Sequence, residues 1–180
     1  MPNSDMRTIF RKYLKDNFIE TGCYMGRGIQ AALDVGFKKI YSIELSDRFY
    51  DLCSIKFKNN PQVKIIKGDS ATVLGQLLSE IKDETTFWLD GHFSGEGTAR
   101  GLFSSPLLEE LRQIKDHDIK THTIIVDDLR CWSKNDPKIG FDAQDIKKVL
   151  LDINPSYHIA YECGTVPDDI IVAVAYPHIK

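Results

Sequence analysis

Short apolar runs alternate along the chain with segments whose apolar residues recur every three or four positions. The recurring segments predict helices, because this spacing places the apolar side chains on one helical face; they cover 28–36, 46–57, 70–81, 106–114 and 142–153. The apolar runs predict strands at 18–19, 40–43, 63–66, 85–89 and 123–126. Strands that alternate with helices in this way favour an α/β fold with a mostly parallel sheet and helices on both faces.

The two ends of the chain depart from this alternation. Two more strands are predicted at 157–161 and 170–175, and the short polar turn between them favours an antiparallel hairpin. Residues 7–13 form a short potential helix that could pack on the sheet or cover a ligand. A length of 180 residues suits one domain over 1–180, with 1–15 as an N-terminal helical segment.

Capping residues predict where several helices begin and end. Ser46 and Ser70 are predicted N-caps, because their hydroxyls can accept from backbone N–H groups of the first turn. Pro106 is predicted as the first residue of its helix. Asp142 is predicted to open the last helix, and Gly36 to stop an earlier one.

Composition narrows the function classes. Hydrophobic residues make up 42% and charged residues 27%, as in ordinary globular proteins. The formal net charge of -3 gives no basic excess for a phosphate backbone, so nucleic acid is not a favoured partner. No apolar run approaches a membrane span, and residues 1–15 are too polar for a signal peptide. The four cysteines lack C-x-x-C spacing, which favours reduced thiols and a cytoplasmic location.

The stretch 17–44 carries the most specific chemistry. It contains a glycine turn between a strand and a helix, with the pattern E-x-G-x-x-x-G-x-G at 20–28. Dinucleotide loops run G-x-G-x-x-G and hold a pyrophosphate, which Glu20 would repel. Glu20 suits a cation, such as a sulfonium or an amino group, and Glu44 at the end of the next strand suits a ribose diol. The alternative is a plain nucleotide-binding or inert turn.

This pattern resembles motif I of the class I S-adenosylmethionine (SAM)-dependent methyltransferases. The resemblance implies a Rossmann-like three-layer sandwich with a seven-stranded sheet in the order 3-2-1-4-5-7-6 and a C-terminal antiparallel hairpin. It implies that Glu20 and Gly22 hold the methionine part of SAM and that Glu44 binds the ribose. The remaining residues expected in the cofactor site are Asp69 and Ser70 at the adenine, together with Thr21, Gly26, Leu45 and Asp90.

Acidic residues follow several of the predicted strands, and those after the fourth and fifth strands should meet. They are Asp90 and the pair Asp127 and Asp128. Three neighbouring carboxylates would repel one another unless a divalent cation lay among them, and oxygen ligands suit Mg²⁺, or else Ca²⁺ or Mn²⁺. The set resembles the metal-dependent O-methyltransferases that act on catechols and sugars, in which the metal lowers the pKa of the acceptor hydroxyl. The alternative is that these acids only cap helices and turns.

The residues after Asp90 are candidates for the chemistry itself. A histidine with a pKa near neutral can take a proton from a hydroxyl, so His92 is the expected catalytic base beside Asp90. The relatives carry an acid or a lysine there, and a surface histidine without a role is the alternative. The loop 91–105 is long and is expected to close over the acceptor, with Arg100 available for an acidic group; a plain solvated loop is the alternative.

The sequence therefore predicts a SAM-dependent, Mg²⁺-assisted O-methylation of a small hydroxylated acceptor, such as a sugar or glycan. Two other classes stay open: a SAM-binding module without catalysis, and an NAD-dependent oxidoreductase, which the glycine spacing disfavours. Neither nucleic acid nor a membrane is an expected partner. A homodimer is possible, because the short chain has no evident substrate domain.

Overall fold

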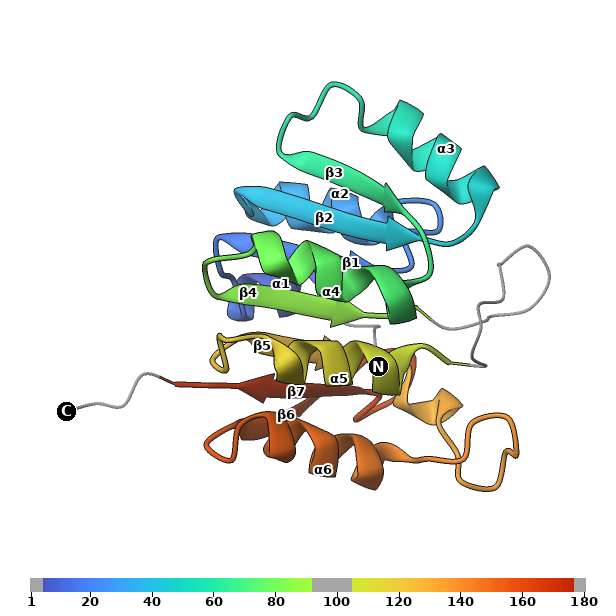
Figure 1. Cartoon of the computed structure of the whole chain (residues 1–180), viewed down its shortest axis with the longest axis vertical. Coiled ribbons are helices and arrows are strands. Elements are labelled where there is room, and N and C mark those ends of the chain that lie inside the picture. Colours follow the sequence, from blue (N-terminus) through green and yellow to red (C-terminus); the bar gives the residue numbers. More distant parts are fainter. Residues whose placement is uncertain (1–4, 92–104, 177–180) are drawn as a thin grey trace.

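The chain folds around one seven-stranded sheet (Figure 1). In the computed structural model, residues 5–91 and 105–176 are described. The strands are β1 (Asn17–Thr21), β2 (Lys39–Glu44), β3 (Val63–Lys67), β4 (Thr85–Leu89), β5 (Thr123–Val126), β6 (His158–Glu162) and β7 (Ile170–Val174). Their order is β3-β2-β1-β4-β5-β7-β6, with β1 to β5 parallel and β7 antiparallel to both of its neighbours. The predicted fold class, strand order and terminal hairpin are confirmed.

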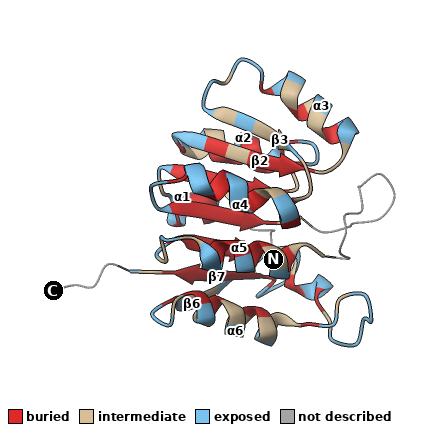
Figure 2. Cartoon of the chain, in the orientation of Figure 1, coloured by how far each residue is buried: buried red, intermediate tan, exposed pale blue. Residues whose placement is uncertain are grey.

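Helices cover both faces of this sheet. The six α-helices of the described residues are α1 (Met6–Lys12), α2 (Arg27–Val35), α3 (Asp47–Lys56), α4 (Ser70–Glu80), α5 (Leu107–Asp116) and α6 (Ala143–Ile153). Buried residues of α1, α2 and α3 form one core cluster with the sheet, and those of α4, α5 and α6 form the other. Both faces of the central strands are therefore shielded, and β1, β4, β5 and β7 are buried along their whole length (Figure 2).

The N-terminal helix α1 packs on the sheet. The ring of Phe10 lies 4.9 Å from that of Phe18 and 5.1 Å from that of Trp88, measured between centroids. Aromatic pairs at this spacing add to the stabilisation from burial alone. This contact packs α1 onto β1 and β4, and Met6 and Ile9 of the same helix also line the cavity beside the sheet. The two roles that the sequence left open for residues 7–13 are thus compatible in one position.

Three of the predicted helix ends need comment. Asp142 caps α6 in a capping box with Asp145, as its placement predicted. The prediction of Ser70 as an N-cap is wrong: Asp69 is the N-cap of α4 and accepts from the Ala71 N–H at 3.0 Å. The Ser70 hydroxyl does not cap the helix, because it donates to Glu110, a buried acid of α5. Pro106 precedes α5 by one residue, and a short 3₁₀ helix over Leu129–Cys131 was not predicted.

The helices are short as well as amphipathic. Among the described residues, none is long and apolar enough to cross a lipid bilayer.

Candidate active site

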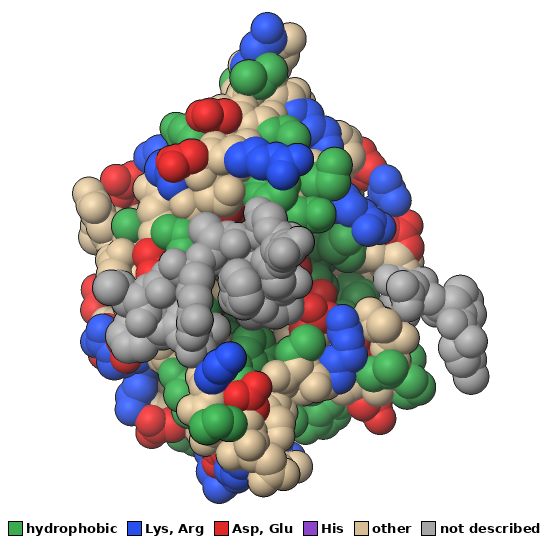
Figure 3. Space-filling view, turned by 90° about the vertical axis from the view of Figure 1, so that its right-hand side faces the viewer, with side chains coloured by type: hydrophobic (Ala, Val, Ile, Leu, Met, Phe, Trp, Pro, Cys, Tyr) green, Lys and Arg blue, Asp and Glu red, His purple; other side chains and the backbone are tan. Residues whose placement is uncertain are grey.

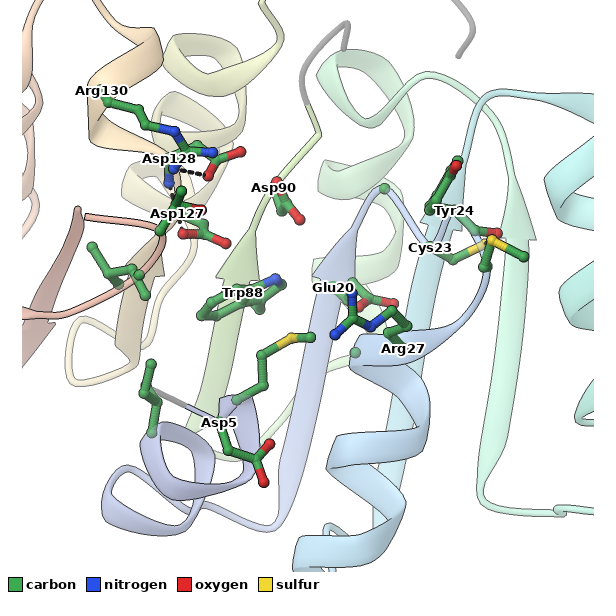
Figure 4. A pocket seen from close by; sticks show the side chains of 18 residues that line it. Asp5, Glu20, Cys23, Tyr24, Arg27, Trp88, Asp90, Asp127, Asp128 and Arg130 are labelled. Atoms are coloured by element: carbon green, nitrogen blue, oxygen red, sulfur yellow. Dashed lines mark hydrogen bonds and ion pairs between the residues drawn. The ribbon is translucent and has the colours of Figure 1, made fainter. Parts of the chain in front are cut away.

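A cavity of about 540 Å³ opens where β1, β4 and β5 end (Figure 4). Figure 3 views the molecule from this end of the parallel strands and shows acidic, basic and apolar side chains intermixed. The lining comes from α1, the glycine turn, the strand ends and the β6–β7 turn; its charged members are Asp5, Glu20, Arg27, Asp90, Asp127, Asp128 and Arg130. In an open parallel sheet this is the edge at which ligands bind.

Glu20 lies at the floor of the cavity and is held by two neighbours. Its Oε2 accepts from the Ser42 hydroxyl at 2.6 Å, and its carboxylate lies against the backbone of Gly28. A Cβ atom on Gly28 would lie 1.7 Å from Glu20 Oε1, so only glycine leaves room there. Burial is the main reason why the pKa of Glu20 is raised to about 8, with smaller contributions from Asp90 and Glu44. A ligand cation would lower this pKa and stabilise the carboxylate.

The glycine turn lies against the end of β4. Gly22 has φ 83°, and a Cβ atom on it would lie 3.0 Å from the backbone oxygen of Asp90. Tyr24 in the same turn also has a positive φ, 45°, which is uncommon for a residue with a side chain. Its ring lies 4.5 Å from that of Phe49, measured between centroids. The sequence pattern did not single out Tyr24, because nothing in the spacing marks a left-handed tyrosine.

Glu44 fixes the shape of the turn from the neighbouring strand. One of its carboxylate oxygens accepts from the Tyr24 N–H at 3.0 Å and the other from the Ser46 N–H at 2.7 Å. Glu44 is buried and does not line the cavity, while the carbonyl of the adjacent Leu45 accepts from Lys67 Nζ. The predicted ribose contact of Glu44 and the predicted place of Leu45 in the cofactor site therefore stay predictions, and in this structure Glu44 orders the glycine turn.

The predicted adenine residues meet a buried acid that the sequence analysis missed. The Ser70 hydroxyl donates to Glu110 Oε1 at 2.5 Å, and Glu110, on α5, is 1% exposed. A Cβ atom on Gly91 would lie 3.1 Å from both Glu110 Oε1 and Thr21 Oγ1, so the ends of β1, β4 and α4 converge on Glu110. Burial raises the pKa of Glu110 to about 7. An acid on the apolar face of α5, three residues after Leu107, was the available signal.

The acids that follow β4 and β5 also line the cavity. Asp90 and Asp127 extend into it from neighbouring strand ends (Figure 4). Burial, followed by the charges of Asp90 and Asp128, raises the pKa of Asp127 to about 7. Among the described residues Asp127 has no ion-pair partner, and only the Asp128 N–H donates to its carboxylate, at 2.7 Å. A hard divalent cation would relieve this repulsion, and the predicted metal role of Asp90 and Asp127 stays a prediction.

The third predicted metal ligand is engaged by an arginine instead. Asp128 has φ 58°, and its Oδ1 lies 2.5 Å from Arg130 Nη1. Arg130 Nη1 also pairs with Asp169, which is 1% exposed and accepts from the Thr165 N–H at 3.0 Å. The described residues whose carboxylates come within 4.8 Å of one another are Asp127, Asp128 and Asp169, so Asp169 joins this group where Asp90 was expected. Asp169 lies in the β6–β7 turn, far from Asp127 along the chain, so no local pattern marked it as a member of this group.

Two predictions concern residues outside the described ranges. His92, the expected catalytic base, and Arg100 in the expected acceptor loop both fall within 92–104. Their roles stay predictions. Asp90, the last predicted catalytic residue, lines the cavity.

No protein-family model and no curated protein sequence matches the chain. Among solved structures, it is similar to TomG from Streptomyces achromogenes, an O-methyltransferase involved in tomaymycin synthesis solved with SAM, at a TM-score of 0.65 and 11% identity over 96% of this chain and 78% of that one. An O-methyltransferase from Bacillus cereus in complex with SAH, the demethylated product of SAM, gives a TM-score of 0.63 and 17% identity over 95% and 79%. The SAH-bound methyltransferase PaMTH1 from Podospora anserina gives 0.62 and 16% over 96% and 76%.

These similarities, together with the sheet order, confirm at the level of the fold the resemblance that the glycine pattern suggested. The chain has the class I SAM-dependent methyltransferase fold.

Proposed function

We propose that the protein is a SAM-dependent O-methyltransferase, assisted by a divalent cation such as Mg²⁺, that acts on a small hydroxylated acceptor. The observation that carries this proposal is the shared cavity: the glycine turn with Glu20 and the acids Asp90 and Asp127 line one space of about 540 Å³. A methyl donor bound at the turn and an acceptor bound at the acids would thus be neighbours. Similar folds that bind SAM or SAH support the choice of cofactor.

Different residues of the cavity would bind the methyl donor and the cation. Bound SAM would supply an electrophilic methyl group, and a bound cation would supply Lewis acidity that lowers the pKa of a hydroxyl. Glu20 and Gly22 would hold the methionyl end of the donor, and Asp90 with Asp127 would hold the cation. Arg130 keeps Asp128 in place. Trp88 and Ile9 contribute apolar side chains to the wall of the cavity.

The lining also bears on the class of acceptor. Its acids are Asp5, Glu20, Asp90, Asp127 and Asp128, against the cations Arg27 and Arg130. Even with Glu20 protonated, the other four acids outnumber the two cations, which disfavours a phosphate backbone, so we expect no nucleic-acid acceptor. Several carboxylates in one lining suit a polyhydroxylated ring, whose hydroxyl groups can donate hydrogen bonds to them. A sugar or glycan is therefore the first class of acceptor to test.

Calorimetric titration with SAM and SAH, each with Mg²⁺ and with chelator, tests the proposal. We expect micromolar binding of either ligand and a separate response to Mg²⁺, followed by methyl transfer to a member of a panel of sugars and catechols. Binding without transfer to any hydroxylated acceptor would favour a SAM-binding module. Binding of NAD in place of SAM and SAH would overturn the proposal.

A further inference from the structure

Arg27 gives the cavity a cation that no acid of the described chain neutralises. It is the first residue of α2, it is exposed, and it lines the cavity on the same side as Glu20 (Figure 4). The other lining arginine, Arg130, pairs with both Asp128 and Asp169. Within 5–91 and 105–176, Arg27 has neither an ion pair nor a side-chain hydrogen bond. Its guanidinium therefore keeps its donors for a ligand.

Two of the acids that line the cavity, Asp5 and Glu20, are held by other groups. Asp5 pairs with Arg7 at 3.2 Å and caps α1 by accepting from the Arg7 N–H. Glu20 is fixed by the Ser42 hydroxyl and by the backbone of Gly28. Because the raised pKa of Glu20 keeps it protonated at neutral pH, it does not compensate the charge of Arg27 in the free protein. Neither of these two acids therefore compensates the charge of Arg27 in the free protein.

We propose that Arg27 binds a carboxylate, and specifically the α-carboxylate of the methionyl group of SAM. The inference rests on the proposed function, because it places the methionyl end at Glu20. A guanidinium can bind a carboxylate through two parallel N–H bonds, which fixes orientation as well as charge. The methionyl group carries an ammonium beside its carboxylate. Glu20 would bind the ammonium, and Arg27 would bind the carboxylate. Arg27 would then select the intact amino-acid end of the cofactor.

The carboxylate that Arg27 binds could also belong to an acidic acceptor instead of the cofactor. The cavity continues from Arg27 past Trp88 to Asp90 and Asp127, so an acceptor could also place an acidic group near Arg27. The two sources differ in one respect that can be measured. The cofactor carboxylate affects the affinity for SAH without any acceptor, whereas an acceptor carboxylate affects turnover only.

The experiment compares SAH with 5′-methylthioadenosine, which keeps the nucleoside but lacks the amino-acid end. Both are titrated into the wild-type protein, Arg27→Gln, Arg27→Lys and the control Arg11→Gln, which alters an exposed arginine of α1 outside the cavity. We expect Arg27→Gln to weaken SAH binding by about 10-fold to 100-fold, with 5′-methylthioadenosine binding unchanged. Arg27→Lys should recover part of the loss, and Arg11→Gln should show none.

Other results would separate the two levels of the proposal. Wild-type affinity for SAH in Arg27→Gln would overturn the assignment of Arg27 to the cofactor carboxylate. If this variant lost turnover with acidic acceptors only, Arg27 would bind a carboxylate of the acceptor. An equal loss for SAH and 5′-methylthioadenosine would show that Arg27 shapes the turn instead of reading the carboxylate. Failure of the wild-type protein to bind either ligand would overturn the proposed function itself.

Discussion

At the scale of single residues, the site depends on a close approach between Glu20 and Gly28. The carboxylate occupies the space where any other residue at 28 would place its Cβ atom, 1.7 Å from Oε1. Glu20 cannot easily move away, because it is 2% exposed and bonded to Ser42. A glycine of the sequence motif is thereby explained by contact with the acid of the same motif.

Gly28→Ala is therefore expected to displace the Glu20 carboxylate and to weaken SAH binding by at least about 10-fold, the equivalent of one lost charge-assisted hydrogen bond. Isothermal calorimetry measures the change, and a chemical denaturation curve measures any accompanying loss of stability. Gln30→Ala, on the exposed face of the same helix, is the control and should bind normally. Normal SAH affinity in a folded Gly28→Ala protein would contradict the role given to Glu20.

Asp127 allows the two halves of the cavity to be tested separately. Its raised pKa reflects burial and the charges of Asp90 and Asp128, which a cation would relieve. Asp127→Asn is expected to abolish the Mg²⁺ response and metal-dependent turnover, and to leave SAH affinity within about 3-fold of the wild-type value, less than one hydrogen bond. Equal losses of Mg²⁺ and SAH binding would contradict the division into a cofactor half and a cation half.

At the scale of secondary-structure elements, α5 is fastened to α4 by buried polar contacts. Glu110 accepts from the Ser70 hydroxyl, and Gln113, one turn later, donates to the carbonyls of Ser70 and Ala71 at 3.1 and 3.0 Å. The Gly75 N–H donates back to Gln113 at 2.5 Å. These bonds fix the start of α4, which carries the predicted adenine residues Asp69 and Ser70. Helix packing therefore determines the position of that part of the site.

Glu110→Ala should lower the free energy of unfolding by about 1–3 kcal/mol, because the Ser70 hydroxyl loses its acceptor in a buried place. Glu109→Ala is the matched control on the preceding residue, where the acid pairs only with the exposed Arg112, and should cost less than about 1 kcal/mol. Urea denaturation of both variants measures the difference. Similar small losses in the two would show that the α4–α5 contact does not depend on Glu110.

The same contact shows where prediction from sequence succeeds and where it fails. Each strand and each long helix was predictable, because the spacing of residues such as Leu107, Leu111 and Ile114 reports only which face is buried. The choice of Asp69 over Ser70 as N-cap depends on Glu110, which lies 40 residues away in the sequence. The same holds for Asp169, which reaches the cluster after β5 through the terminal hairpin. Local pattern cannot identify a partner brought in by tertiary structure.

At the scale of the whole molecule, one end of the sheet collects buried acids without enough cations. Glu20, Glu110 and Asp127 have pKa values raised to about 8, 7 and 7, and burial is the first cause in each case. Cations that pair with acids elsewhere, such as Lys134 with Asp145, lie on the exposed surface. The free protein thus holds protons at this end that the unfolded chain would release. Ligands carrying positive charge would replace those protons.

This arrangement predicts how stability depends on pH. A carboxyl whose pKa is raised on folding binds more protons in the native than in the unfolded state, so stability falls as pH rises from the ordinary value near 4.5 to the raised values of about 7 and 8. We expect the free energy of unfolding to be about 1–3 kcal/mol lower at pH 8 than at pH 6.

Thermal unfolding in matched buffers measures this dependence of stability on pH. Glu20→Gln, whose amide oxygen can still accept from Ser42, should make the dependence weaker. Saturating SAH should also reduce it, because the ligand ammonium would take over the compensation of Glu20. A midpoint that stays constant or rises from pH 6 to pH 8 would mean that these acids are already compensated in the free protein, and would remove the electrostatic reason for a cationic ligand in this cavity.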